Sequence, residues 1–139
     1  DIDLVGTFNV FKACFDHLNR PGASLMAITA PEAVRPLHFQ AHVCAAKAGV
    51  LGLTRAMAKE FGPDGIRANA IAAGMTATRQ TQVVVESSEM SAPILDRTPM
   101  KRFARPEEIA GAALFLSSQQ ASYVNGQTLN VCGGFSISG

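Results

Sequence analysis

Helical and strand patterns alternate along this sequence of 139 residues, and no other feature limits its possible folds as strongly. Apolar residues recur at steps of three and four in three segments, Leu4–Leu18, Ala41–Phe61 and Pro106–Leu116. Such spacing predicts three amphipathic helices. Short apolar runs bounded by turn residues predict three strands, Ser24–Thr29, Ile66–Ala72 and Gln127–Val131. This order is typical of an α/β layer structure with a parallel sheet.

Turn residues separate these elements, except in one long segment. Pro21-Gly22 ends the first helix, Gly62-Pro63 ends the second, and Asn125-Gly126 forms a turn before the last strand. Residues 73–100 are rich in Thr, Ser and Gln, and we predict an irregular segment there. Unstructured segments of that length in a compact domain are usually lids or binding loops.

The elements correspond to half of a doubly wound sheet. A complete dinucleotide-binding fold opens with a strand, a Gly-rich turn and a helix that holds the pyrophosphate. The sequence contains no G-x-G-x-x-G spacing. We therefore predict that residues 1–139 form the C-terminal half of one doubly wound, parallel-sheet Rossmann domain, without its phosphate-binding N-terminal half. Because the sequence starts at Asp1 and not at Met, we expect a longer polypeptide.

Composition excludes several other classes. The net charge is +1 and basic residues do not cluster, so we expect no nucleic-acid partner and no anionic membrane surface. No apolar run reaches the roughly 18 residues of a membrane span. The three cysteines, Cys14, Cys44 and Cys132, are widely spaced and form no C-x-x-C pair, which supports neither a zinc site nor a disulfide framework. We expect reduced, mostly buried thiols in a cytoplasmic protein.

Four stretches carry a family resemblance: DIDLVGTFNV at 1–10, HVCAAKAGVLGLTRAMAKEFGPDGIRANAIAAG at 42–74, RFARPEEIAGAALFLSS at 102–118 and ASYVNGQTLNVCGG at 121–134. In this order and spacing they resemble consecutive segments of the short-chain dehydrogenase/reductase family. The resemblance covers essentially the whole chain. It implies a nicotinamide-dependent oxidoreductase.

In that family a Tyr and a Lys, spaced Y-x-x-x-K, share one helix face. The Tyr hydroxyl exchanges a proton with the reacting oxygen, and the Lys lowers the pKa of that hydroxyl and binds the nicotinamide ribose. Lys47 matches the family's Lys, but Val43 stands at the Tyr position and has no proton to transfer. The only tyrosine, Tyr123, lies far along the chain from that position.

Two further positions of the family's catalytic set are altered as well. Ala30 stands at the position of the family's Ser, beside Thr29, whose hydroxyl is a candidate for cofactor binding. Asp3 stands at the position of the family's Asn. A standard alcohol–ketone mechanism does not agree with this set.

The 2,4-dienoyl-CoA reductase branch combines an Asp with the retained Lys and lacks the standard Tyr. Asp3, Gly6-Thr7-Phe8-Asn9 and the QAHVCAAK stretch resemble that branch. Hydride goes there to a carbon of a conjugated thioester, so charge develops at the thioester oxygen and needs hydrogen-bond donors. The resemblance implies Asp3 and Lys47 as catalytic residues, NADPH as the cofactor (NADH not excluded) and an acyl-CoA as the substrate.

Each of these residues also has an ordinary structural interpretation. Asp is a common helix N-cap, although the family alignment places Asp3 inside a helix. A lone Lys is most often a surface residue with a buried stem; the A-x-x-K-A-G-V context favours a ribose contact for Lys47. Thr29 is equally well explained as a β-branched residue at a strand end.

The AAGMTAT stretch resembles the family's P-G-x-x-x-T segment, which contacts the cofactor. This implies cofactor-binding roles for Gly74, Thr76 and Thr78, with Ala73 in place of the usual Pro, and a substrate loop at 79–100.

His38 and His42 have the spacing of two metal ligands on a helix, but no third ligand is evident and we predict no metal site. By family position, His42 is a candidate substrate contact.

Two alternatives to a dienoyl- or enoyl-CoA reductase remain: a cofactor-binding but catalytically impaired relative, and a conventional ketone or 3-oxoacyl thioester reductase. The resemblance also implies a homotetramer, which assembles through the long helix and through the last helix and strand.

Overall fold

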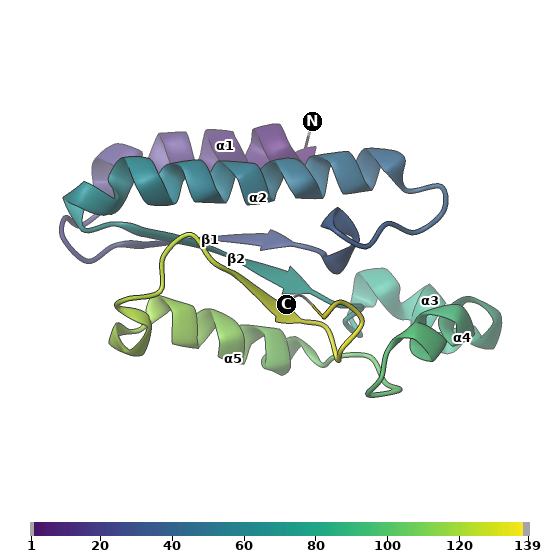
Figure 1. Ribbon diagram of the computed structural model, residues 1–139. Helices are drawn as coiled ribbons and strands as arrows, with labels where there is room; N and C mark the ends of the chain where they lie inside the picture. Colours follow the sequence, from purple (N-terminus) through teal and green to yellow (C-terminus); the bar gives the residue numbers. More distant parts are fainter. Residues whose placement is uncertain (1, 138–139) are drawn as a thin grey trace.

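The computed structural model describes residues 2–137, in which three parallel strands form one sheet between two helical layers (Figure 1). The strands are β1 (Ser24–Thr29), β2 (Arg67–Ala73) and β3 (Thr128–Val131), and they lie in that order. Helices α1 (Ile2–Cys14) and α2 (Ala41–Phe61) cover one face, and α5 (Pro106–Ser117) covers the other. The predicted α/β fold class, half of a doubly wound sheet, is confirmed.

All three strands point the same way because a helical crossover connects each one to the next. Ser24 is paired with Arg67 and Thr29 with Ala72 between β1 and β2, and Ala73 is paired with Val131 between β2 and β3. The carboxyl ends therefore meet at one edge of the sheet. In doubly wound folds this edge is where ligands bind.

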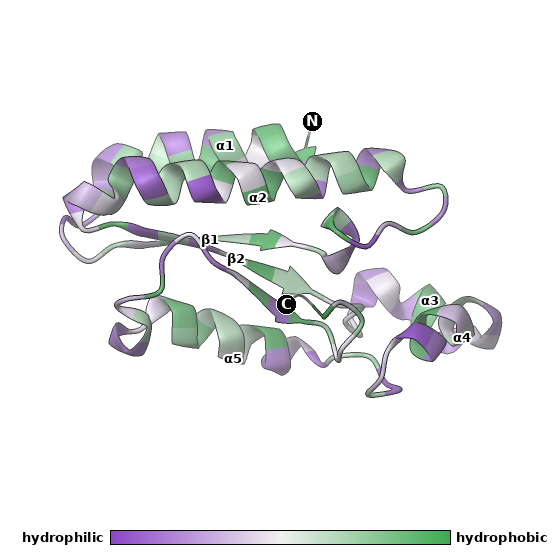
Figure 2. Ribbon diagram, viewed as in Figure 1, coloured by the Kyte–Doolittle hydropathy of each residue, from purple (hydrophilic) through white to green (hydrophobic). Residues whose placement is uncertain are grey.

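Small apolar residues in the central strand let both helical layers pack closely. Ala68, Ala70, Ile71 and Ala72 on β2 are at most 2% exposed. On one face Ala68 joins a cluster with Leu25, Met57, Ala58 and Ile66, and on the other Ile71 packs with Leu116 and Ala121. Figure 2 shows hydrophobic residues along much of the strands, and helices that mix hydrophobic and hydrophilic residues. A strand covered on both faces is expected to be mainly apolar, and the two polar residues of β2, Arg67 and Asn69, donate to backbone carbonyls.

Residues 73–100 correct the prediction of an irregular segment. They contain α3 (Gln82–Glu86) and α4 (Ser88–Arg97), joined at Ser87, whose hydroxyl accepts from the Met90 amide at 3.3 Å as an N-cap. Pro93 lies inside α4 and has no backbone N–H to donate to the helix. Because Pro normally ends a helix, the sequence pattern did not predict α4. Helices this short rely on tertiary packing, which propensity does not report.

Smaller differences concern element ends and the cysteines. The first helix ends at Cys14, and a 3-10 turn, Phe15–His17, continues the stripe expected to reach Leu18. Of the three thiols only Cys132 is buried; Cys14 is exposed and Cys44 is partly buried, so the expectation of mostly buried thiols was wrong for Cys14. Among residues 2–137, no helix is both long and apolar enough to cross a membrane.

Candidate functional site

An ion pair at the carboxyl end of the sheet joins the two predicted catalytic residues. The Nζ atom of Lys47 lies 3.3 Å from Oδ1 of Asp3. The Lys47 side chain is 19% exposed and that of Asp3 is 43% exposed. Lys47 is therefore not a solvated surface lysine: most of its side chain is enclosed, and its ammonium contacts a carboxylate that solvent and ligands can reach.

The two residues come from neighbouring helices that lie side by side (Figure 1). Asp3 is in the first turn of α1, within the helix, and Lys47 is in the second turn of α2. A Cβ atom built on Gly49 would lie 2.6 Å from Cδ2 of Leu4, the residue after Asp3. The missing side chain at Gly49 thus allows α1 to approach α2 close to the ion pair.

Gly49 had not been identified from the sequence. A Gly in the interior of a helical pattern is a usable signal, since it lowers helix stability and often has a packing reason.

The Thr29 hydroxyl is used inside the protein. Its Oγ1 donates to the backbone carbonyl of Lys47 at 3.0 Å, and the residue is only 2% exposed. The bond ties the carboxyl end of β1 to the turn of α2 that carries Lys47. The structure thus gives Thr29 a definite partner in the protein, and direct cofactor binding by its hydroxyl stays a prediction.

The positions that usually carry Tyr and Ser hold only aliphatic side chains. Val43 is partly buried one turn before Lys47 on α2, and Ala30 follows β1, where its carbonyl accepts from the Ala33 amide at 3.0 Å. Tyr123 is fully exposed and precedes β3, at the opposite edge of the sheet. It lies away from Lys47 and does not replace the missing phenol.

The three residues mapped onto the cofactor segment lie just beyond β2. The Gly74 amide donates to the Val131 carbonyl at 2.9 Å, and a Cβ atom at Gly74 would lie 2.7 Å from Cα of Cys132. Thr76 donates to the Gly74 carbonyl at 2.9 Å, and the Thr78 and Thr81 hydroxyls lie 3.1 Å apart. These contacts shape the loop itself, and the cofactor contacts of Gly74, Thr76 and Thr78 stay predictions.

The histidines do not join the ion pair. His38 and His42 are both exposed, one in the loop before α2 and one in its first turn. No group of three or more potential metal ligands occurs within residues 2–137. The substrate contact proposed for His42 stays a prediction.

A second charged cluster fixes the start of α5. The Glu108 carboxylate accepts from both terminal nitrogens of Arg102, at 2.8 and 2.7 Å, and from the Arg105 amide at 2.8 Å. The Arg102 hydrogen bonds, followed by the Arg105 amide, lower the pKa of Glu108 to about 2. A carboxylate in the first helical turn also interacts favourably with the helix dipole. We assign this cluster a structural role.

Comparison with known proteins agrees with this arrangement. The family described as enoyl-(acyl carrier protein) reductase matches residues 1–136. The peroxisomal 2,4-dienoyl-CoA reductase of Saccharomyces cerevisiae is 37% identical over 134 residues, covering 96% of this chain and 46% of that protein. A 3-oxoacyl-[acyl-carrier-protein] reductase from Thermotoga maritima is 35% identical over 138 residues, 99% of this chain and 55% of that protein.

A solved structure supports the same relationship. The gluconate 5-dehydrogenase of Burkholderia cenocepacia, in complex with NADP and tartrate, is 32% identical with a TM-score of 0.88, covering 96% of this chain and 53% of that one. The chain spans about half the length of the curated relatives it matches. On the family match, the relatives and the fold together, this chain belongs to the short-chain dehydrogenase/reductase family.

Proposed function

We propose that the protein reduces a conjugated acyl thioester in the manner of a 2,4-dienoyl-CoA reductase. The observation that carries this proposal is the Asp3–Lys47 ion pair beside a valine at position 43. A carbonyl reductase of this family needs a hydroxyl there, whereas reduction at carbon does not. The similarity to the yeast dienoyl-CoA reductase supports the same choice.

The residues present suit a nicotinamide cofactor. Lys47 contacts one carboxylate oxygen and has N–H groups left to donate to ribose hydroxyls. Its largely enclosed side chain fixes the ammonium at the ligand-binding edge. We propose Lys47 as the ribose contact, Gly74, Thr76 and Thr78 as further cofactor contacts, and NADPH as the cofactor, since the similar gluconate dehydrogenase was solved with NADP. When bound, the reduced nicotinamide supplies a hydride.

The charged pair then acts on the thioester substrate. Negative charge develops on the thioester oxygen as the conjugated system is reduced, and the Lys47 ammonium is a preorganised positive charge close to it. The Asp3 carboxylate, which solvent can reach, is placed to hold a water that protonates the substrate carbon. Val43 presents an apolar surface that helps to exclude other water from Lys47.

A second candidate follows from Val43 and Ala30: a relative that binds cofactor without turnover. Both positions lack the hydroxyl groups that serve proton transfer elsewhere in the family. A conventional 3-oxoacyl reductase, like the Thermotoga relative, would need a proton donor from outside these positions. Turnover measurements separate all three functions.

The assay follows NADPH oxidation by the protein at its full natural length with a 2,4-dienoyl-CoA and, separately, with a 3-oxoacyl-CoA. We expect turnover of the dienoyl substrate only, and about a hundredfold lower kcat for Asp3→Asn and for Lys47→Met. Lys59→Met is the matched control, because Lys59 is exposed on the same helix. Absence of turnover with every thioester refutes the reductase, and full activity of both variants refutes the assigned roles.

Exposed apolar residues agree with the proposed homo-oligomer. Val5, Phe8 and Val10 on α1 are each at least 49% exposed, and Leu114 on α5 is 74% exposed. Large exposed apolar side chains on these helices are candidates for an association surface. We propose that copies of the protein associate through α1–α2 and through α5, and light scattering of the purified protein tests this.

A further inference from the structure

A recess that contains two arginines lies at the ligand-binding edge of the sheet. It has a volume of about 410 Å³ and is lined by Val34, Arg35, Pro36, Arg97 and Phe135. Small-molecule sites usually have about 300–1,000 Å³. None of these residues has a role in the ion pair, the cofactor loop or the start of α5.

Three segments build the recess, each from beyond the carboxyl end of a different strand. After β1, the amides of Val34 and Arg35 both donate to the Pro31 carbonyl, at 3.1 and 2.9 Å. After β2, Arg97 is the last residue of α4. After β3, the Phe135 amide donates to the Cys132 carbonyl at 3.1 Å.

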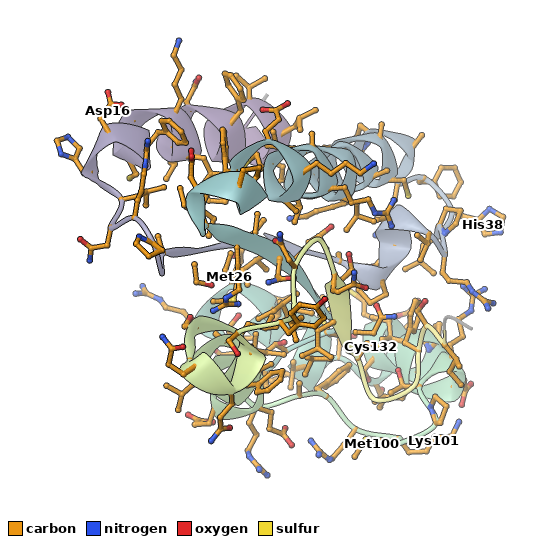
Figure 3. The ribbon with its side chains drawn as sticks, turned by 60° about the vertical axis from the view of Figure 1, so that its left-hand side comes forward. Asp16, Met26, His38, Met100, Lys101 and Cys132 are labelled. Carbon is orange, nitrogen blue, oxygen red and sulfur yellow. The ribbon has the colours of Figure 1, made fainter. Side chains whose placement is uncertain are left out.

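The recess therefore shares the edge that holds Asp3 and Lys47. Figure 3 shows this end of the molecule, with His38 of the loop after β1 and Lys101 of the segment after α4 both on the right-hand side, whereas Asp16 lies at the opposite end.

Within residues 2–137, no carboxylate forms an ion pair with either guanidinium group. The ion pairs of this part of the chain involve cations other than Arg35 and Arg97. The neighbouring acid, Asp96, lies 3.9 Å from Lys101. A planar guanidinium binds phosphate oxygens through two parallel hydrogen bonds. Two of them in one recess favour a ligand with several negative charges.

The rest of the recess lining is apolar, which restricts the class of possible ligands further. Phe135 is partly buried, and Val34 and Pro36 are exposed. The Phe135 ring offers a flat apolar face, and Val34 and Pro36 add further apolar surface, which a free phosphate would not use but an aromatic base would. The combination suits a phosphorylated adenosine.

We propose that this recess binds the phosphorylated adenosine end of a coenzyme A thioester, with the acyl end at Asp3 and Lys47. The inference about the acyl end rests on the proposed function. An NADP cofactor offers the same chemistry, but the adenosine half of a dinucleotide binds the Gly-rich half of a doubly wound fold. Coenzyme A carries its extra phosphate on the 3′ oxygen of the ribose and NADP on the 2′ oxygen, so two probes separate the sources.

The test is calorimetric binding of adenosine 3′,5′-bisphosphate and of adenosine 2′,5′-bisphosphate to the full-length protein. In the double variant Arg35→Gln/Arg97→Gln we expect about a tenfold loss of affinity for the 3′,5′ compound and no change for the 2′,5′ compound. Arg55→Gln, an exposed arginine on α2, is the matched control and should change neither. Unchanged affinity for the 3′,5′ compound in the double variant overturns the proposal, as does an equal loss for both compounds.

Steady-state kinetics of the double variant provide an independent test of the proposed binding site. For a dienoyl substrate as the CoA ester, the double variant should raise KM about tenfold and leave kcat unchanged. The N-acetylcysteamine ester of the same acyl group, which has no phosphate, should be unaffected. An equal effect on both esters assigns the arginines to another role and overturns the proposal. If neither ester is reduced while the 3′,5′ compound still binds through the arginines, the proposed function fails and the binding site stands.

Discussion

Replacing Gly49 by Ala tests whether the approach of α1 to α2 sets the ion pair. The added Cβ atom would lie 2.6 Å from Cδ2 and 3.2 Å from Cδ1 of Leu4. The first distance is far shorter than van der Waals contact and the second is tight, so α1 or the Leu4 side chain must move. Because Asp3 precedes Leu4, a shift of α1 changes the distance between Asp3 and Lys47.

Two opposing contributions decide how much the Gly49→Ala substitution changes the free energy of unfolding. Gly to Ala inside a helix stabilises by about 1 kcal/mol. Overpacking by one methyl group costs about 1–3 kcal/mol, and the lower end applies where a flexible side chain can turn away, as Leu4 can. Gly52, on the same helix, has no atom within 4 Å of its added Cβ and therefore carries the first term alone. Gly49→Ala should thus be about 1 kcal/mol less stable than Gly52→Ala.

Urea unfolding of the two variants and the wild type measures that difference. Leu4→Ala combined with Gly49→Ala should recover the lost stability beyond additivity, which a double-mutant cycle detects. Turnover should fall in Gly49→Ala and stay unchanged in Gly52→Ala. Equal stability of the two Gly→Ala variants would refute the packing argument, and equal turnover would refute its link to Asp3.

Three further changes test other contacts. Thr29→Val should cost about 1 kcal/mol in urea unfolding because the hydrogen bond to the Lys47 carbonyl is lost, while Thr29→Ser keeps the hydroxyl and should lose less; equal losses would contradict the role of that bond. The pKa of Glu108 is lowered from 4.5 to about 2, so its contribution is present above pH 4.5 and is lost as the pH falls toward 2. Between about pH 5 and about pH 2, the Tm of Glu108→Gln should therefore fall less than the Tm of the wild type. Parallel curves of Tm against pH for the two proteins would contradict this. Asn69→Ala should cost about 2 kcal/mol or more, measured by urea unfolding, since the buried Asn69 side chain bonds two backbone groups before β3; a loss below about 0.5 kcal/mol would contradict it.

Periodicity was sufficient for most of the fold. The sequence predicted β1 and α2 with their observed ends, because turn residues and Pro or Gly flank a clear apolar pattern at both. It missed α3 and α4. The three consecutive valines of α3 and Pro93 of α4 disfavour helix formation locally, and the surrounding structure outweighs them. Helix propensity reflects only the local sequence, so it does not detect helices that the surrounding structure stabilises.

The candidate site, too, was predicted only in part from the sequence. The family resemblance singled out Asp3 and Lys47, and the structure joins them in an ion pair. Spacing alone would not predict this contact, because the two residues are 44 positions apart and lie on different helices. The partner of the Thr29 hydroxyl was not visible, since the bond links β1 to α2 across 18 residues of chain. The sequence also did not indicate that Arg35 and Arg97 line the same recess, because Arg97 is placed by α4, which the sequence did not predict.

The contacts around Lys47 differ in what they contribute. An ion pair with a carboxylate that is 43% exposed adds little to folding, because solvent screens it. Thr29, which is 2% exposed, and the close approach of Leu4 to Gly49 constrain the backbone directly. Lys47 is therefore positioned by packing and by a backbone hydrogen bond, not by its partner charge. Because the fold does not depend on the Asp3 carboxylate, that group can exchange its Lys47 contact for water or substrate without loss of structure, as the proposed proton delivery requires.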